Sequence, residues 1–316
     1  MKGIIKALFT SLLLIPLLII LSGCDDESSG LGDGPILIEP LGIVVETSGN
    51  MAVADAGIPA IMRVEVDTGD RTIFSGDGNG TGPQLMSPTG IGILNEGDFA
   101  VSDSETDTIL RIDQVNGNRT LLSGNDIGEG AALNLPTDIA VEEDGNIVVI
   151  NTGSVSILSV DTETGDRSII SGQGTGDGPE LVSPAGIALL SGGNIVVTDS
   201  GLPAVLLIDR DTGDRSIISE NTTGNGPSFR SPNYLAVESD GNILLTDTEE
   251  TGIFRVDFNT GDRSILSDNS IGSGPQFQEA FGAALEASGN LAVTDSQRGT
   301  VTRVLISTGN RLFITR

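Results

Sequence analysis

The stretch Gly193-Asn194-Ile195-Val196-Val197-Thr198-Asp199-Ser200, with the turn Thr212-Gly213-Asp214-Arg215 that follows it, recurs along the whole chain. Arginines that close this turn stand 48 residues apart, at Arg71, Arg119, Arg167, Arg215, Arg263 and Arg311. Two further series have the same spacing. Glycines stand at Gly49, Gly97, Gly145, Gly193, Gly241 and Gly289, and polar residues at Asp55, Asp103, Asn151, Asp199, Asp247 and Asp295. Three such series without an insertion indicate six copies of one repeat.

Each copy holds four short apolar runs, separated by turns rich in Gly, Asn and Asp. In the fourth copy they cover residues 186–190, 194–199, 204–209 and 216–219. These runs predict strands, because none is long enough to show a helical period. Apolar residues at consecutive positions indicate sheets covered on both faces. We therefore predict an all-β, six-bladed β-propeller of four-stranded antiparallel blades. The alternative is an open parallel β-solenoid, whose coils are normally much shorter than 48 residues.

The phase of the repeat makes a prediction about ring closure. The first copy begins at its innermost strand, near residues 41–46, and the last ends at its outermost, residues 311–316. No strand is left for one end of the chain to complete a blade begun by the other. We expect the first and sixth blades to meet by side-chain packing, without strand exchange.

The patterns G-N-I-V-V-T-D-S and V-D-x-x-T-G-D-R-S-I resemble the NHL-repeat and gluconolactonase-like group of six-bladed propellers. The resemblance covers residues 36–316. It implies the fold and leaves the function open, because the matching residues are turn and strand residues.

The N-terminal segment predicts export and anchoring. Lys2 and Lys6 precede an apolar run, residues 7–21, that is typical of a signal peptide. Leu-Ser-Gly-Cys at 21–24 resembles the lipobox of bacterial lipoproteins, which implies a signal peptide over 1–23 and a lipid on Cys24. The alternative is an ordinary signal peptide with a chance cysteine. Residues 24–35 then form the lipidated cysteine and a flexible tether, and 36–316 the propeller.

The predicted location is the cell envelope. By resemblance to Gram-negative lipoproteins, Asp25 directly after the cysteine implies retention at the periplasmic face of the inner membrane. The membrane, reached through the N-terminal lipid, is then the first expected partner.

The composition excludes much chemistry. The chain has no His, no Trp and one Cys, and both lysines lie in the signal peptide. Their removal takes the formal charge from −28 to −30. Histidine bases, lysine Schiff bases, disulfides and thiolate zinc sites are therefore absent from the mature chain. So negative a chain should repel nucleic acid and anionic surfaces, and we expect no nucleic-acid partner.

Residues that recur in every copy are interpreted as structural. We expect the repeat arginine to pair with a carboxylate across its hairpin, and the strand-ending Asp to accept loop N–H groups. The Gly-rich loops between copies, such as residues 76–83, faintly resemble calcium loops. Their oxygen-bearing positions change from copy to copy, which favours solvated turns.

Residues that differ between copies are the better candidates for function. Small residues, mostly Gly, usually follow the repeat proline, where the innermost strand begins near the channel mouth. The exceptions, which we predict to bind a ligand, are Thr137, Asp138, Asn233, Tyr234 and Phe281.

Two acidic clusters lie on opposite copies of the ring, and could bind a cation or a basic partner. They consist of Asp103, Glu105 and Asp107 in the second copy and of Asp247, Glu249 and Glu250 in the fifth. The alternative is that these carboxylates only keep the chain soluble.

Two functions follow. The first is a membrane-anchored, extracytoplasmic binding or scaffolding propeller that recognises a protein or small ligand at the channel mouth. The alternative is a metal-dependent, lactonase-like hydrolase with a central cation, Ca²⁺ being the one cofactor considered. The resemblance implies asparagines after the blade prolines as cation ligands, and this chain has one at Asn233 alone. Asp138 and Asn233 together could still hold a cation. No catalytic residue can be assigned, which favours the binding protein over an enzyme.

Overall fold

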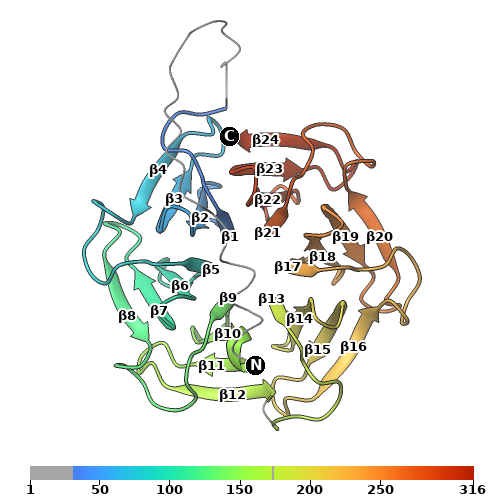
Figure 1. Cartoon of the computed structure of the whole chain (residues 1–316), viewed down its shortest axis with the longest axis horizontal. Coiled ribbons are helices and arrows are strands. Elements are labelled where there is room, and N and C mark those ends of the chain that lie inside the picture. The colour runs from blue at the N-terminus through green and yellow to red at the C-terminus, as the bar shows by residue number, and fades with distance from the viewer. Residues whose placement is uncertain (1–30, 173) are drawn as a thin grey trace, which may run out of the picture.

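The computed structural model describes residues 31–172 and 174–316 and forms a ring of six blades (Figure 1). Cys24, Asp25 and the predicted signal peptide lie outside these residues. Blades 1 to 3 consist of β1 (Pro40–Val45), β2 (Met51–Asp55), β3 (Ala60–Val64), β4 (Arg71–Ser75); β5 (Pro88–Ile93), β6 (Phe99–Asp103), β7 (Thr108–Ile112), β8 (Arg119–Ser123); and β9 (Pro136–Val141), β10 (Ile147–Asn151), β11 (Ser156–Val160), β12 (Arg167–Gly172). A 3₁₀ turn, η2 (Thr152–Ser154), follows β10.

Blades 4 to 6 repeat the plan. They consist of β13 (Pro184–Leu189), β14 (Ile195–Asp199), β15 (Ala204–Ile208), β16 (Arg215–Glu220); β17 (Pro232–Val237), β18 (Ile243–Asp247), β19 (Gly252–Val256), β20 (Arg263–Ser267); and β21 (Ala280–Leu285), β22 (Leu291–Asp295), β23 (Thr300–Val304), β24 (Arg311–Thr315). Every blade is a four-stranded antiparallel sheet, from its innermost to its outermost strand. The predicted fold is confirmed.

The core lies between neighbouring blades rather than within any one of them. Val148 and Ile157 of blade 3, for example, pack in one cluster with Val197 and Leu206 of blade 4, all of them fully buried. The second strand of each blade is buried along its entire length. This explains why its apolar residues stand at consecutive positions instead of alternating.

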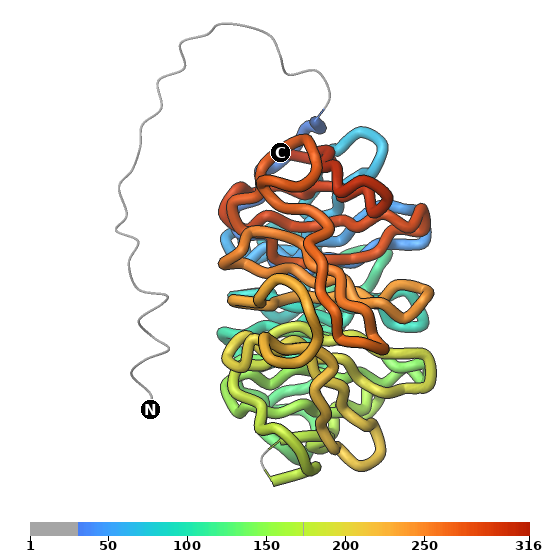
Figure 2. Tube along the Cα trace, turned by 90° about the vertical axis from the view of Figure 1, so that its right-hand side faces the viewer, coloured from blue at the N-terminus to red at the C-terminus, as the bar shows by residue number. Residues whose placement is uncertain are grey.

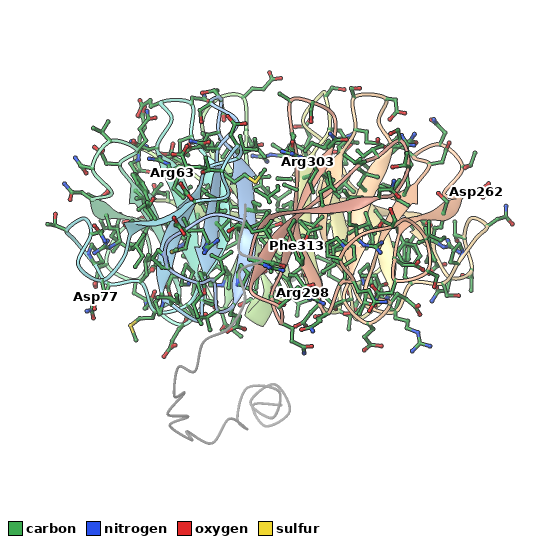
Figure 3. All side chains as sticks on the ribbon, turned by 90° about the horizontal axis from the view of Figure 1, so that it is seen from above. Arg63, Asp77, Asp262, Arg298, Arg303 and Phe313 are labelled. Carbon is green, nitrogen blue, oxygen red and sulfur yellow. The ribbon has the colours of Figure 1, made fainter. Side chains whose placement is uncertain are left out.

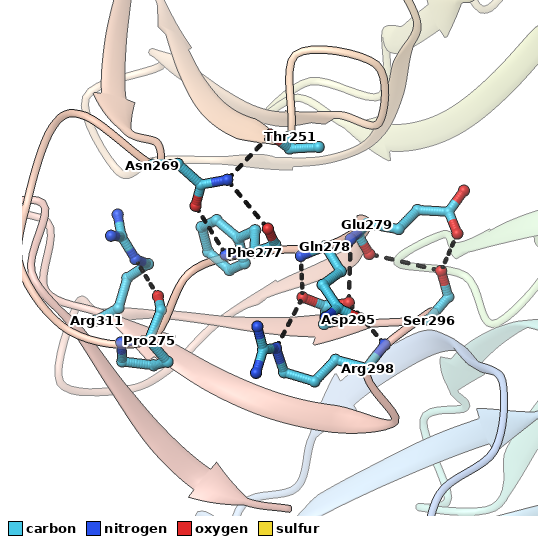
Figure 4. Close-up of polar contacts among 10 residues, drawn as sticks. All are labelled: Thr251, Asn269, Pro275, Phe277, Gln278, Glu279, Asp295, Ser296, Arg298 and Arg311. Carbon is cyan, nitrogen blue, oxygen red and sulfur yellow. Dashed lines mark hydrogen bonds and ion pairs between the residues drawn. The ribbon is translucent and has the colours of Figure 1, made fainter.

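The two faces of the ring carry different loops. We call the side with the Thr-Gly-Asp-Arg turns the turn face. The opposite side, where the innermost strands begin and where the loops after each strand-ending Asp lie, is the mouth face. Asp103 connects these loops, since its carboxylate accepts hydrogen bonds from the amides of Met86 (2.7 Å) and Thr106 (3.2 Å). In blade 6, Asp295 accepts from Gln278, Glu279 and Arg298 in the same way (Figure 4). The role predicted for this residue is confirmed.

The repeat arginines fasten each blade to the one before it. The Nε of Arg119 donates to the carbonyl oxygen of Pro83 (2.6 Å), and its guanidinium also donates to Asn79 O (2.9 Å) and to Ser75 Oγ (2.8 Å) at the end of blade 1. The predicted pairing with a carboxylate across the hairpin is wrong. The connecting loop turns its backbone oxygens inward, and these oxygens accept the hydrogen bonds of the guanidinium instead.

Blades 1 and 6 close the ring with the same device. Residues 31–39 take the place of a connecting loop, and Arg71 donates to Pro35 O (2.8 Å), to Leu31 O (3.1 Å) and to Thr315 Oγ1 on β24. Thr294 of blade 6 also donates to Leu41 O on β1 (2.7 Å). Residue 31 and β24 therefore lie side by side (Figure 2). Within the described residues no strand is exchanged, as the phase of the repeat predicts.

Candidate functional site

Glycines bring the innermost strands close together around the axis. Gly42, Gly90, Gly186 and Gly282 occupy the second position after the proline slot. A Cβ atom on Gly90 would lie 2.4 Å from Thr137 O of the next blade, and one on Gly282 2.1 Å from Leu41 O. Only blades 3 and 5 carry a side chain at this position, namely Asp138 and Tyr234.

Tyr234 fills the axis. Its side chain leaves β17 in blade 5, and its hydroxyl donates to Thr89 O of the opposite blade 2 (3.2 Å) and to Thr137 O of blade 3 (3.5 Å). The ring of Phe281 packs against it, with 5.2 Å between ring centroids. Tyr234 is only 6% exposed, and burial raises its pKa well above the ordinary value, with Asp138 adding to the effect. The phenol is therefore a permanent donor.

Asp138 is buried beside it and bonds across a blade boundary. One carboxylate oxygen accepts from the amide of Ile139 (2.9 Å), and the other accepts from the amide of Ile187 in blade 4 (3.0 Å). Burial raises the pKa of Asp138 to about 7, although the two amides act in the opposite direction.

These two side chains stand near two gaps in a ring of hydroxyl groups. In four blades, the next-to-last residue of the second strand has a hydroxyl that donates a hydrogen bond to the following blade. Ser102, for example, donates to Thr137 O (2.9 Å). The other members are Thr198, Thr246 and Thr294. Blades 1 and 3 carry Ala54 and Ile150 there. Ala54 has no hydroxyl to offer the backbone oxygen of Thr89, and this oxygen accepts a hydrogen bond from Tyr234 instead. In blade 3, where Ile150 has no hydroxyl, Asp138 accepts the hydrogen bond that joins blade 3 to blade 4.

The five predicted ligand-binding residues therefore divide into two kinds. Asp138 and Tyr234 are brought together at the axis, where their polar atoms are already engaged within the fold. Thr137, Asn233 and Phe281 are half-buried, and the hydroxyl of Thr137 shares a hydrogen bond with Thr152 (2.8 Å). Each oxygen of Asp138 accepts one backbone amide, and Asn233 is half-buried in blade 5. Binding of Ca²⁺ stays a prediction.

The residues of the two acidic clusters differ in burial and in the groups that they contact. Asp103 and Asp247 are fully buried and cap loops, so they face the protein. Glu105 and Glu249 are exposed, Asp107 accepts from the amide of Leu135 (2.7 Å), and Glu250 forms an ion pair with Arg230. In the described part of the chain, no three acidic or cysteine side chains converge as metal ligands do.

The mouth face carries an apolar feature that the sequence analysis missed. Exposed apolar side chains stand just before the innermost strands of four consecutive blades, and we call them the apolar arc: Ile38 (48% exposed), Met86 (43%), Leu135 (36%) and Val182 (51%). Ile38, Met86 and Val182 stand two residues before the proline slot and Leu135 one residue before it, whereas blades 5 and 6 carry Arg230 and Gln278 two residues before the slot. The signal was present in the sequence, as Ile, Met and Val at one repeat position that faces solvent.

A groove of about 580 Å³ adjoins the arc at the boundary of blades 1 and 2. Ile58, Pro59 and Met86 line its apolar side, while Asp77 and Arg119 contribute charge. Met86 thus belongs to both features, which makes the exposed apolar surface continuous with a concave one.

Comparison with known proteins supports the architecture. No family model and no curated protein matches the chain. Among solved structures, virginiamycin B lyase from Staphylococcus aureus is similar with a TM-score of 0.61 at 16% identity, over 88% of this chain and 84% of that one. A gluconolactonase from Xanthomonas campestris has a TM-score of 0.64 at 16% identity, over 83% and 84% of the two chains. An auxiliary nutrient binding protein from Bacteroides ovatus has a TM-score of 0.62 at 14% identity, over 85% and 69%.

The resemblance to the gluconolactonase-like group is thereby confirmed for the fold. At these identities the neighbours show the fold alone, and their functions are mixed: a lyase, a lactonase and a binding protein. Among the described residues, no helix has the length and apolar character needed to cross a bilayer.

Proposed function

We propose that this protein is a lipid-anchored, extracytoplasmic binding propeller whose mouth face recognises a protein partner. The observation that carries the proposal is the apolar arc. Large apolar side chains that are exposed together on consecutive blades of one face are typical of a protein-binding surface.

The axis supports binding at the surface rather than chemistry in the centre. Tyr234 and Asp138 direct their polar atoms into the fold, whereas Thr137, Asn233 and Phe281 are half-buried and keep part of their surface accessible. An apolar surface that extends over four blades suits a protein segment better than a small molecule, which the groove at the boundary of blades 1 and 2 would bind by itself.

The charges on the mouth face specify the partner further. Glu105 and Glu249 lie exposed in the loops of the opposite blades 2 and 5. A partner that covers the arc meets Glu105 in blade 2, and one that also reaches across the axis to blade 5 meets Glu249. We expect apolar side chains in the centre of its binding surface and Lys or Arg at its edge.

Site-specific photocrosslinking in cells tests the proposal. A photoreactive side chain at Met86 or Val182 should yield one and the same crosslinked protein. Val115, which is 84% exposed in the turn between β7 and β8 on the turn face, is the matched control and should yield none. The variant Ile38→Ser with Leu135→Ser should abolish the crosslinks while the circular dichroism spectrum is unchanged. Equal crosslinking from Val115, or none from the arc, would refute this function.

The anchor is tested separately. Metabolic labelling with a fatty acid should mark the native chain, and Cys24→Ser should abolish the label and release the protein from the membrane fraction. Labelling that persists in Cys24→Ser would remove the anchor from the proposal and leave the mouth face untouched.

A further inference from the structure

The outermost strand of blade 6 departs from the other five blades. Leu312 on β24 is 52% exposed, whereas its equivalents are hydroxyl residues: Thr72, Thr120, Ser168, Ser216 and Ser264. Phe313, half-buried, follows it at a position that is Ile or Leu in the other blades. An apolar side chain exposed on the edge strand of a sheet invites pairing with other chains unless something covers it.

Two arginines that the other blades also lack flank Phe313. Arg298 comes from the loop between β22 and β23, Arg316 follows β24, and each guanidinium carbon lies 6.0 Å from the centre of the Phe313 ring. Their equivalents in blade 5 are the acids Glu250 and Asp268. Among the described residues, the guanidinium of Arg298 forms one ion pair, a long one with Asp295 (4.0 Å), whose oxygens already accept backbone amides. We call Leu312, Phe313, Arg298 and Arg316 the rim patch. Phe313 and Arg298 are labelled in Figure 3, and Leu312 projects from the opposite face of the same edge strand, where it lies beside Arg303 of β23.

The chain enters the propeller at the rim patch. Leu31 O accepts a hydrogen bond from Thr315 (3.3 Å), which lies between Phe313 and Arg316 in sequence. Seven residue steps separate Leu31 from Cys24, so the two can be at most about 25 Å apart. Any lipid on Cys24 therefore holds this part of the rim close to the bilayer.

From this we propose that the rim patch rests on the phospholipid surface and holds the disc edge-on. The inference rests on the proposed lipid anchor. Phospholipid headgroups offer phosphate oxygens to Arg298 and Arg316, and the interface accepts the apolar side chain of Leu312. The mature chain carries a charge of −30, so most other orientations bring carboxylates toward the headgroups. Edge-on, the mouth face stands upright and open to its partner.

A fluorescence experiment tests this orientation, because the chain contains no tryptophan. Three single-Trp variants are compared: Leu312→Trp on the rim, Ile38→Trp on the mouth face and Val115→Trp on the turn face. Each full-length protein is purified in detergent and reconstituted into phosphatidylcholine–phosphatidylglycerol vesicles with brominated lipid tails. Bromine quenches only a Trp at the membrane, so Leu312→Trp should be quenched and the other two should not.

A second arm separates this inference from the anchor. The chain from Cys24 onward is coupled through that cysteine, its only thiol, to a maleimide lipid in the same vesicles. Quenching of Leu312→Trp alone in this arm supports the rim patch even if fatty-acid labelling shows that cells do not acylate Cys24. Quenching of Ile38→Trp or Val115→Trp instead, or of none of the three, overturns the proposal.

Charge variants check the role of the arginines. Arg298→Gln with Arg316→Gln in the Leu312→Trp background should weaken the membrane contact by about five-fold per arginine. Arg111→Gln, on a half-buried arginine of blade 2 paired with Glu96, is the control and should have no effect. Equal quenching in all of these variants would show that the arginines do not contribute, and would overturn the assignment of headgroup phosphate as their ligand.

Discussion

The hydroxyl of Tyr234 on blade 5 donates a hydrogen bond to the backbone oxygen of Thr89 on blade 2, across the axis of the ring. Blades 2 and 5 stand opposite each other (Figure 1), so a single side chain joins two strands that no sheet connects. Because Ala54 supplies no hydroxyl to this oxygen, the phenol is its side-chain donor.

Removing that hydroxyl should destabilise the fold. Tyr234→Phe leaves the buried Thr89 oxygen without its donor, and we expect a loss of about 1–3 kcal/mol in the free energy of unfolding, measured by urea denaturation. The control Thr222→Val removes an exposed hydroxyl that bonds only Glu220, and should change this energy by less than about 0.5 kcal/mol. Equal stability of Tyr234→Phe and the native chain would mean that the axial bond contributes nothing.

Asp138 should make stability depend on pH. Its pKa is about 7 in the folded protein against an ordinary value of 3.8, so the folded state binds the proton more tightly than the unfolded chain. The stability contributed by this group therefore falls as pH rises from about 4 to about 7, and is constant above. The full difference is at most about 4 kcal/mol.

The variant Asp138→Asn isolates this effect. It cannot ionise, so its unfolding free energy should fall less between pH 4 and pH 7 than that of the native chain. Asp209→Asn is a control in which the pKa shift has the opposite sign. Hydrogen bonds from Thr212 lower the pKa of this exposed carboxyl, so its contribution to stability is lost as the pH falls and not as it rises. A native chain and an Asp138→Asn variant with parallel pH profiles would show that Asp138 titrates normally.

The ring closure should depend on Arg71 more than an internal boundary depends on Arg119. Arg71→Gln removes charge-assisted bonds to Leu31, Pro35 and Thr315, and should cost about 1.5–3 kcal/mol. Hydrogen exchange should rise over residues 31–39, because this segment is joined covalently to the propeller only at β1. In Arg119→Gln the corresponding loop is covalently held at both ends, so its exchange should rise less. Similar exchange in both variants would contradict this account of closure.

The glycines around the axis should resist substitution. A Cβ on Gly90 would lie 2.4 Å from Thr137 O, so Gly90→Ala must push two innermost strands apart. We expect a loss of about 1–3 kcal/mol in thermal or urea unfolding. Gly124→Ala is the comparison, since its nearest new neighbour is the side-chain methyl of Thr108 at 3.1 Å, which can move. A smaller loss in Gly90→Ala than in Gly124→Ala would show that the strands are not held this closely.

The sequence predicted the architecture because the repeat is free of insertions. Copies that agree at Gly, Asp and Arg positions report the turns, and their phase reports how the ring closes. It also predicted the caps formed by Asp103 and Asp247, since a carboxylate after a buried strand commonly accepts loop amides. These are short-range consequences of the pattern.

What the sequence did not predict depends on contacts between copies. The ligands of Arg119 are backbone oxygens of a loop some 36 to 40 residues away, and backbone oxygens leave no mark in a sequence. Asp138 and Tyr234 were identified as exceptions, but their burial follows from how far the glycines let the strands approach. The gaps at Ala54 and Ile150 were visible, and acquire meaning only once the hydroxyl ring is seen.

Those gaps tie distant positions into an exchangeable pair. The substitution Ala54→Ser would give the Thr89 oxygen a second hydrogen-bond donor. Loss of the Tyr234 hydroxyl would then lower the free energy of unfolding only slightly. A lineage could thus move between the present ring and one with five regular hydroxyl contacts by two substitutions, at residues 54 and 234, that lie 180 residues apart. Such a route would transfer the hydrogen bond to Thr89 from a side chain of the opposite blade to one of the adjacent blade, while leaving every sheet as it is.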